Sequence, residues 1–203
     1  MKLIGMLDSP YVRRVAISAK RLGIALEHES VSVFRHFEQF QQINPVVKAP
    51  TLVLDDGEVL MDSTLIIDYL EALAEPGRSL MPKGIEQRVR SLRLIGLALA
   101  ACEKSVQLYY ERNLRPAEIQ YEPWVERVEG QLAAAYAALE RELEKHPLKT
   151  DGSIDQDGLT LAVAWSFTNL VVPDQVAGAQ CPRIAAFTEY AEGLEAFVST
   201  PID

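Results

Sequence analysis

The 203-residue sequence has little of what marks several large classes of protein. Its two cysteines, Cys102 and Cys181, stand far apart beside small apolar residues, so they form neither a disulfide framework nor the spacing of a metal site. No stretch supplies the ~18 consecutive apolar residues of a membrane span, and Asp8 interrupts the N-terminus before a signal-like apolar core forms. We therefore expect a cytoplasmic protein with two reduced thiols, no bound metal and no association with membranes.

An excess of positive charge is also missing, because the formal net charge is −9. This balance argues against nucleic acid as a partner, since binding it requires a basic surface that displaces counterions from phosphates. The charge is unevenly distributed: residues 1–50 carry seven Lys and Arg against four Asp and Glu, so the rest of the chain holds −12. The first fifty residues thus favour a small carboxylate-bearing ligand as the partner.

Over residues 1–74, short apolar runs alternate with segments of helical spacing. The first helix has clear ends, because Ser9-Pro10 is a typical N-cap followed by proline at the first helical position, and Gly23 is a typical C-terminal stop. In order, the predicted elements are a strand over 3–7, a helix over 10–22, a strand over 26–33, a helix over 35–43, a hairpin over 51–61 and a helix over 64–74. This β-α-β-α-β-β-α order predicts an α/β sheet whose last two strands are antiparallel.

The hairpin is the stretch around which this half of the chain is organised. Two apolar runs, Thr51 to Leu54 and Val59 to Met61, flank a polar turn with one glycine. Pro50 precedes the first run, where a residue without a donor N–H can be accommodated at the strand entrance. After the second run comes Asp62-Ser63, and we predict that Ser63 is the N-cap of the following helix.

Residues 75–82 contain proline and glycine, and nothing after them has the pattern of a strand. We therefore predict an α/β domain over residues 1–76 and an all-helical domain over residues 83–203. The spacing favours long helices after residue 85 and over 125–143, a helix that starts at Thr160 and is apolar nearly all round, and a last helix over 182–198. On the first of these, we expect the inward face to hold Val89, Leu92, Gly96, Leu99, Cys102, Val106 and Tyr109.

Ser9 is the strongest candidate for catalysis, because its hydroxyl stands at a helix N-terminus, which favours anions. A bound thiol with a reference pKa of about 8.5 would need a drop of about two units, or about 2.7 kcal/mol, to ionise near neutrality. A hydrogen bond to a charged group contributes about 1.5–3 kcal/mol and a helix end up to about 2 kcal/mol. One hydroxyl and one helix end are therefore sufficient.

Other kinds of catalytic site find no support in the sequence. The three histidines do not pair by spacing with a serine or cysteine, and there is no glycine-rich phosphate loop. A thioredoxin-type dithiol would need Cys-x-x-Cys at the first helix, where this chain has Ser9-Pro10-Tyr11-Val12. A second binding position is indicated at Asp62-Ser63, because a helix start can hold a carboxylate while Asp62 attracts an ammonium group.

These motifs together resemble the glutathione transferase family, over the chain from Met1 to about Phe197. Ser9-Pro10-Tyr11-Val12-Arg13 is similar to the motif of serine-type members, of the bacterial theta- or zeta-like kind, in which the serine activates the thiol of glutathione. Lys48-Ala49-Pro50 resembles the segment that ends in the family's cis-proline and meets the peptide and glycyl carboxylate of glutathione. Asp62-Ser63 resembles the pair that binds the γ-glutamyl end.

The resemblance implies a thioredoxin-like domain followed by a helical domain, glutathione as cosubstrate and a homodimer. It implies catalysis by Ser9 and glutathione binding by Lys48, Ala49, Asp62 and Ser63. Position alone suggests Tyr109, Arg112 and Trp165 for a pocket that receives a small hydrophobic electrophile. Asp62 and Ala49 depart from the family's usual Glu and Val, which leaves a non-catalytic binding or regulatory protein open as an alternative. A glutathione-dependent isomerase, dehalogenase or peroxidase is a second alternative.

Overall fold

The computed structural model describes residues 1–177 and 180–202, which divide into two compact units. The first unit comprises Met1–Met81 and the segment from Gly193 onward, and the second comprises Pro82–Glu192. We had predicted a helical domain over residues 83–203. The contacts instead group the described residues after Gly193 with the first unit.

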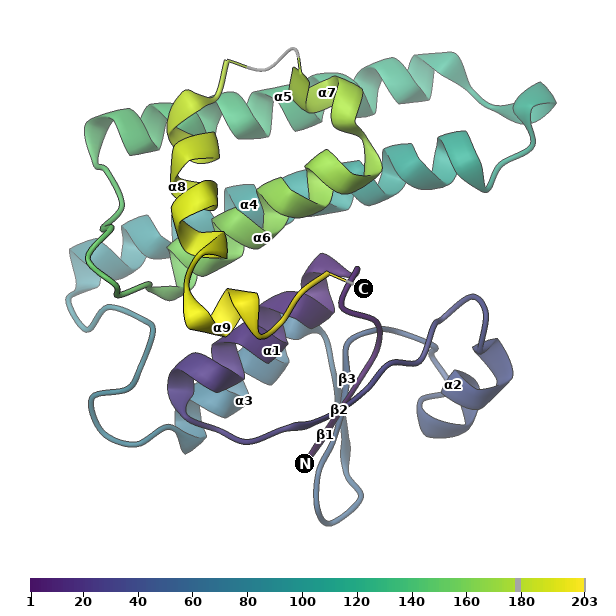
Figure 1. The fold of residues 1–203 in the computed structure, drawn as a ribbon. Helices are drawn as coiled ribbons and strands as arrows, with labels where there is room; N and C mark the ends of the chain where they lie inside the picture. Colours follow the sequence, from purple (N-terminus) through teal and green to yellow (C-terminus); the bar gives the residue numbers. More distant parts are fainter. Residues whose placement is uncertain (178–179, 203) are drawn as a thin grey trace. The chain divides into compact units, whose positions relative to one another are not determined.

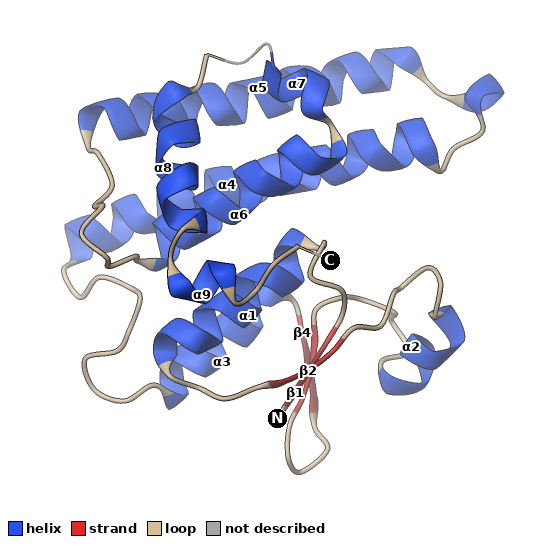
Figure 2. Ribbon diagram, viewed as in Figure 1, coloured by secondary structure: helices blue, strands red, loops and turns tan. Residues whose placement is uncertain are grey.

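The first unit is a four-stranded mixed sheet with helices on both faces, which confirms the predicted thioredoxin-like architecture (Figures 1 and 2). The strand order is β2-β1-β3-β4, in which β1 is parallel to β2 and antiparallel to β3. Helices α1 and α3 cover one face and α2 lies on the other (Figure 1). The elements are β1 (Lys2–Ile4), α1 (Pro10–Leu22), β2 (Glu27–Glu29), α2 (Phe37–Ile43), β3 (Thr51–Val53), β4 (Val59–Met61) and α3 (Ser63–Leu73).

The hairpin forms as predicted, since β3 and β4 are antiparallel with Thr51 opposite Met61 and Val53 opposite Val59. The first helix also has its predicted ends: Ser9 is the N-cap residue, and Gly23 adopts φ of 77°, a left-handed conformation that glycine accepts readily. The β2 segment differs from the prediction. It forms only three residues of strand, and because it is an edge strand its first two residues are exposed.

The short helix α9 (Glu195–Val198) and the residues after it pack along α1 within the first unit. The Arg13 guanidinium donates from Nε to the Thr200 carbonyl at 2.9 Å and lies 5.5 Å from the centre of the Phe197 ring. Lys20 donates to the carbonyl and hydroxyl of Ser199. These contacts explain why the end of the chain belongs with the first unit.

The second unit is helical, as predicted. Helix α4 packs against α5 and α6, and α8 packs against α5 and α6. The elements are α4 (Ile85–Asn113), the 3₁₀ turn η1 (Ala117–Ile119), α5 (Glu122–Lys145), α6 (Gln156–Val171), α7 (Pro173–Ala177) and α8 (Pro182–Glu192). Helix α6 is buried on nearly every side over its first three turns, which agrees with its apolar sequence.

The predicted inward face of α4 is wrong. Ile85, Val89 and Leu92 are 73%, 60% and 52% exposed, and of the expected face only Cys102 belongs to the buried set. The buried face is rich in small residues, which allow helices to approach closely: Ser91, Leu94, Ile95, Ala98, Ala101, Cys102, Ser105 and Leu108. Helix α4 therefore has two apolar faces, and the predicted one carries the exposed side chains of Val89 and Leu92.

Two helix boundaries also differ from the sequence interpretation. Helix α6 begins at Gln156, one turn before Thr160, and the Thr160 hydroxyl donates to the Gln156 carbonyl inside the helix. The expected single helix over 182–198 is two helices, because α8 ends at Glu192 and α9 begins at Glu195. Gly193 lies in the break between them.

Candidate functional site

Ser9 stands at the N-terminus of α1, directly after the turn that follows β1. Its backbone has extended geometry, with φ of −71° and ψ of 122°, and Pro10 occupies the first turn of the helix. The Ser9 side chain makes no capping hydrogen bond, in contrast to our expectation that the hydroxyl would both cap the helix and face a ligand. The half-buried hydroxyl therefore retains its capacity to donate to an anion at this positive helix end.

The segment Lys48-Ala49-Pro50 forms a turn just before β3, and its Ala49–Pro50 peptide bond is cis. Two buried side chains fix this turn. Asn44 donates from Nδ2 to Thr51 Oγ1 at 2.9 Å, and the Thr51 hydroxyl donates to the Lys48 carbonyl at 2.7 Å. The sequence analysis did not identify Asn44, because nothing in the spacing indicates that it bonds to Thr51.

Gly5 explains how this turn comes close to α1. It adopts φ of 137°, and a Cβ atom built on it would lie 2.7 Å from Val12 Cγ2 and 3.2 Å from Ala49 Cβ. A side chain at position 5 would thus clash with the first turn of α1 and press against Ala49. The absence of a side chain brings Ala49 next to the helix that carries Ser9.

The N-terminus of α3 is capped by Asp62 and not, as predicted, by Ser63. Asp62 Oδ1 accepts a hydrogen bond from the Thr64 amide at 2.9 Å, and Ser63 is the first residue of the helix. A Glu at this position would have an extra methylene and would be a poor N-cap, so the short side chain has a structural reason. Asp62 also has φ of 72°, a conformation that non-glycine residues rarely adopt and that is often found at functional sites.

Lys48 and Asp62 form an ion pair across the site, with 3.7 Å between Nζ and Oδ2. Their side chains are 52% and 44% exposed, so water screens the attraction and the pair is worth about 0–1 kcal/mol. A ligand carboxylate could therefore draw Lys48 away at little cost. The predicted binding residues Lys48 and Asp62 are thus brought together, and Ser63 is adjacent.

Arg14 is a residue of this region that the sequence analysis missed. It lies on α1 and is only 2% exposed, and its Nη1 donates to Ser63 Oγ at 3.0 Å and to Thr64 Oγ1 at 3.2 Å. The sequence analysis counted Arg14 only as one of the seven basic residues among residues 1–50. No spacing rule connects it with a serine 49 residues later.

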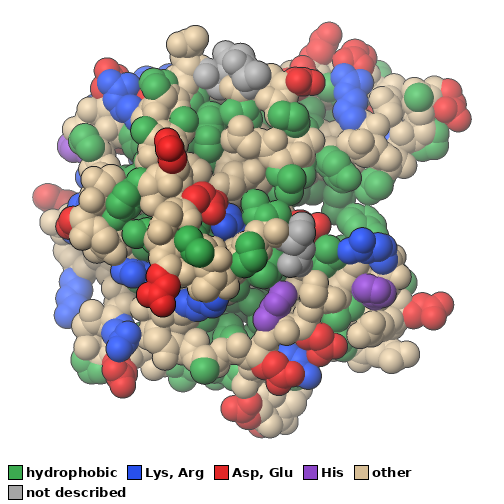
Figure 3. Space-filling model, in the orientation of Figure 1, with side chains coloured by type: hydrophobic (Ala, Val, Ile, Leu, Met, Phe, Trp, Pro, Cys, Tyr) green, Lys and Arg blue, Asp and Glu red, His purple; other side chains and the backbone are tan. Residues whose placement is uncertain are grey.

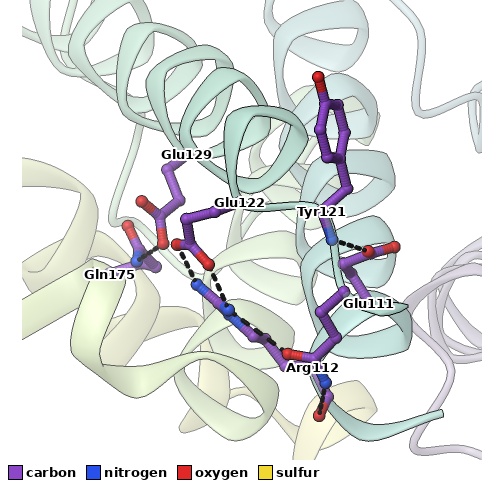
Figure 4. Close-up of polar contacts among 7 residues, drawn as sticks. Glu111, Arg112, Tyr121, Glu122, Glu129 and Gln175 are labelled. Atoms are coloured by element: carbon purple, nitrogen blue, oxygen red, sulfur yellow. Dashed lines mark hydrogen bonds and ion pairs between the residues drawn. The ribbon is translucent and has the colours of Figure 1, made fainter. Parts of the chain in front are cut away.

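Three residues of the second unit were predicted to line an electrophile pocket, and the structure places them in different surroundings. Tyr109 is 37% exposed, whereas Trp165 is 8% exposed and meets the Tyr136 ring edge to face at 4.8 Å between ring centres. Arg112 forms a two-pronged ion pair with Glu122, with N–O distances of 2.7 and 2.9 Å (Figure 4). The role of these three residues remains a prediction.

The contacts around Arg112 tie the end of α4 to the start of α5 (Figure 4). The ion pair raises the pKa of Arg112 and lowers the pKa of Glu122. The preceding residue, Glu111, accepts a hydrogen bond from the Tyr121 amide at 3.0 Å and pairs with Arg115, and these contacts lower the pKa of Glu111. These contacts thus hold together the two ends of residues 114–121, which connect α4 to α5.

Charges of both signs are interspersed on the face drawn in Figure 3, without a continuous basic stripe on that face. Within residues 1–177 and 180–202, no group of three or more metal-binding side chains is found. Over the same residues, none of the helices is long and apolar enough to span a bilayer.

Comparison with known proteins gives three results. Residues 3–78 match the family model described as glutathione S-transferase, N-terminal domain. The chain is 28% identical to the uncharacterized GST-like protein YibF of Escherichia coli K12, with 98% of each chain covered. It is 29% identical to a glutathione transferase family member from Pseudomonas fluorescens Pf-5, whose structure with bound glutathione has a TM-score of 0.86 and covers 100% of this chain and 98% of that one.

A second structure of the Pseudomonas fluorescens protein contains S-(propanoic acid)-glutathione. Its TM-score is 0.81, with 98% of each chain covered.

Proposed function

Because the chain belongs to the glutathione transferase family, we propose that it binds glutathione in its first unit and transfers the glutathione sulfur to small hydrophobic electrophiles. The observation that carries this proposal is the Ser9 hydroxyl, which makes no capping bond and stands at the positive end of α1. In this proposal the hydroxyl donates a hydrogen bond to the bound sulfur and, together with the helix end, favours the thiolate over the thiol.

The other predicted residues hold the tripeptide so that its sulfur reaches Ser9. Lys48 pairs with the glycyl carboxylate, and the backbone of Ala49 pairs with the peptide of glutathione. At α3, Asp62 attracts the γ-glutamyl ammonium group, and the amide and hydroxyl of Ser63 bind the γ-glutamyl carboxylate. Support comes from the proximity of Lys48 to Asp62 and from the bound glutathione in the Pseudomonas relative.

The thiolate would then attack an electrophilic carbon, so that a carbon–sulfur bond forms and a leaving group or a double bond takes up the electron pair. The thiol proton passes to solvent before this step. The relative's ligand S-(propanoic acid)-glutathione is a thioether of glutathione, the kind of product that such a transfer gives.

The test is product analysis after incubation with glutathione and a panel of electrophiles, including an aryl halide. The proposal predicts a glutathione thioether, formed at least tenfold more slowly by Ser9→Ala because one hydrogen bond to a charged group is lost. A product without bound glutathione would indicate an isomerase, dehalogenase or peroxidase instead. No product, and no rise in melting temperature with millimolar glutathione, would favour the non-catalytic alternative.

We further propose that the protein is a homodimer, with the exposed apolar stripe of α4 at the interface. Ile85, Val89 and Leu92 form this stripe, and large contiguous exposed apolar surfaces are unusual in monomers. Light scattering should give twice the mass of the chain. Leu92→Glu should yield the monomeric mass, and an unchanged dimer in that variant would place the interface elsewhere.

A further inference from the structure

Arg14 connects the two helices whose N-termini form the proposed glutathione site. It lies in the second turn of α1, and its Nη1 reaches the first two residues of α3, at 3.0 Å from Ser63 Oγ and 3.2 Å from Thr64 Oγ1. Arg14 and Ser63 are buried, whereas Thr64 is exposed. The guanidinium group therefore lies just beneath the surface at the first turn of α3.

This arrangement has two consequences for an anion at that turn. A guanidinium can only donate hydrogen bonds, so the Ser63 oxygen accepts from Arg14 and its own proton is directed to another acceptor. Guanidinium groups also keep their charge at all ordinary pH values, and the N-terminus of a helix is itself positive. A carboxylate at the start of α3 is thus attracted by both, and meets a hydroxyl whose donor direction is already set.

We propose that Arg14 is a positioning residue that makes this end of the site selective for a carboxylate. The inference rests on the proposed function, in which that carboxylate belongs to the γ-glutamyl residue of glutathione. Arg14 orients the Ser63 hydroxyl and supplies the buried positive charge beneath it. It acts on capture of the tripeptide, whereas Ser9 acts on the sulfur.

The alternative is that Arg14 only fastens α1 to α3. A pair of ligands separates the two roles: glutathione, and 4-aminobutyryl-cysteinyl-glycine, which lacks only the α-carboxylate of the γ-glutamyl residue. Arg13 provides a matched control, because it is the adjacent arginine, is similarly buried at 3% exposure, and donates to the Thr200 carbonyl.

The experiment is calorimetric titration of the full chain with each ligand. We expect the parent to prefer glutathione, and Arg14→Gln to lower glutathione affinity about tenfold or more while changing the analogue's affinity less than about twofold. Arg14→Lys keeps the charge but not the planar donor geometry, so its affinity for glutathione should lie between those of the parent and Arg14→Gln. Arg13→Gln should change both affinities by the same factor.

If Arg14→Gln lowers the affinities for both ligands by the same factor, or lowers neither, the inference is overturned while the proposed function is left intact. If Arg14→Gln does not fold, the same comparison is made with Arg14→Lys, and equal effects on the two ligands again overturn it. A parent protein that binds neither ligand would instead refute the proposed function, and the inference with it.

Discussion

At the scale of single residues, the site depends on side chains that are only weakly held in the absence of a ligand. The Ser9 hydroxyl makes no capping bond, and Lys48 forms a long, half-exposed ion pair with Asp62. Such groups can turn toward a ligand without breaking a strong contact. The surrounding backbone is held more firmly, through Asn44, Thr51 and the cap on α3.

Lys48→Met tests this division between binding and stability. The variant should lower glutathione affinity about tenfold, because a hydrogen bond between charged groups is lost, while the free energy of unfolding changes by less than about 1 kcal/mol. Calorimetry measures the first quantity and urea denaturation the second. Lys145→Met removes an exposed lysine from the end of α5 and should leave the affinity unchanged. Equal affinities in the two variants would remove Lys48 from the site.

At the scale of elements, α8 is anchored by a side chain from another helix. Glu140 of α5 is 8% exposed and accepts hydrogen bonds from the amides of Arg183 and Ile184, at 3.0 and 3.1 Å, in the first turn of α8. Those amides have no partner within their own helix. Glu140 also pairs with the Arg183 side chain at 3.2 Å.

Glu140→Gln should therefore lower the free energy of unfolding by about 1–2 kcal/mol, because charge-assisted bonds to a helix start become neutral ones. Glu144→Gln is the matched control. Glu144 lies one turn later on α5 and, among the residues that the structure describes, pairs only with the exposed side chain of Arg183, so its loss should cost less than about 0.5 kcal/mol. If urea denaturation gives the two variants the same stability, Glu140 does not anchor α8 in the way the contacts indicate.

Elements with an unambiguous local signal could be predicted from the sequence, and α4 shows where the signal fails. Proline at the start of α1 and glycine at its end set both boundaries, because proline fits the first turn of a helix but not its interior, and glycine readily adopts the left-handed conformation that ends it. Helix α4 has apolar residues on two faces, so spacing alone could not decide which one is buried. The large side chains Val89 and Leu92 suggested the wrong face, since small residues such as Ala98 and Ser105 allow the close helix packing.

In the candidate site, too, some residues could be predicted from the sequence and others could not. Ser9, Asp62 and Ser63 were predicted as site residues because each stands at a helix start, and Lys48 because it precedes Ala49-Pro50, positions that sequence motifs identify. Arg14 and Asn44 could not, because their partners Ser63 and Thr51 are fixed by the tertiary fold. The sequence analysis also assigned the N-cap of α3 to Ser63, whereas the structure shows that Asp62 is the N-cap. The sequence could not decide between them, since either side chain can cap a helix.

At the scale of the whole molecule, acidic groups dominate the charge, and their surroundings determine how stability depends on pH. Contacts with donors lower the pKa of Glu111, Glu122 and Glu142, so each contributes stability above its unfolded pKa that is lost as pH falls through the lower, folded value. Asp157 is opposite. Burial is the main cause that raises its pKa, so its ionised form destabilises the fold at neutral pH.

Asp157→Asn should therefore raise the free energy of unfolding at pH 7, and the gain should shrink as pH falls through the raised pKa of Asp157. An Asn side chain can still accept the hydrogen bond that Asp157 receives from the Gly158 amide. Asp155→Asn removes the same charge from an exposed position at the same helix end and should give no gain. Urea denaturation from pH 4 to 8 measures both, and an equal pH dependence in parent and Asp157→Asn would contradict the assignment.

The most direct test of the account is the pKa of the glutathione thiol when it is bound, followed by thiolate absorbance as a function of pH. In the parent we expect a value about two units below the reference of about 8.5. In Ser9→Ala it should rise by at least about one unit, because the hydroxyl no longer bonds to the sulfur. The same pKa in both proteins, or a parent value equal to that of free glutathione, would contradict the role of Ser9.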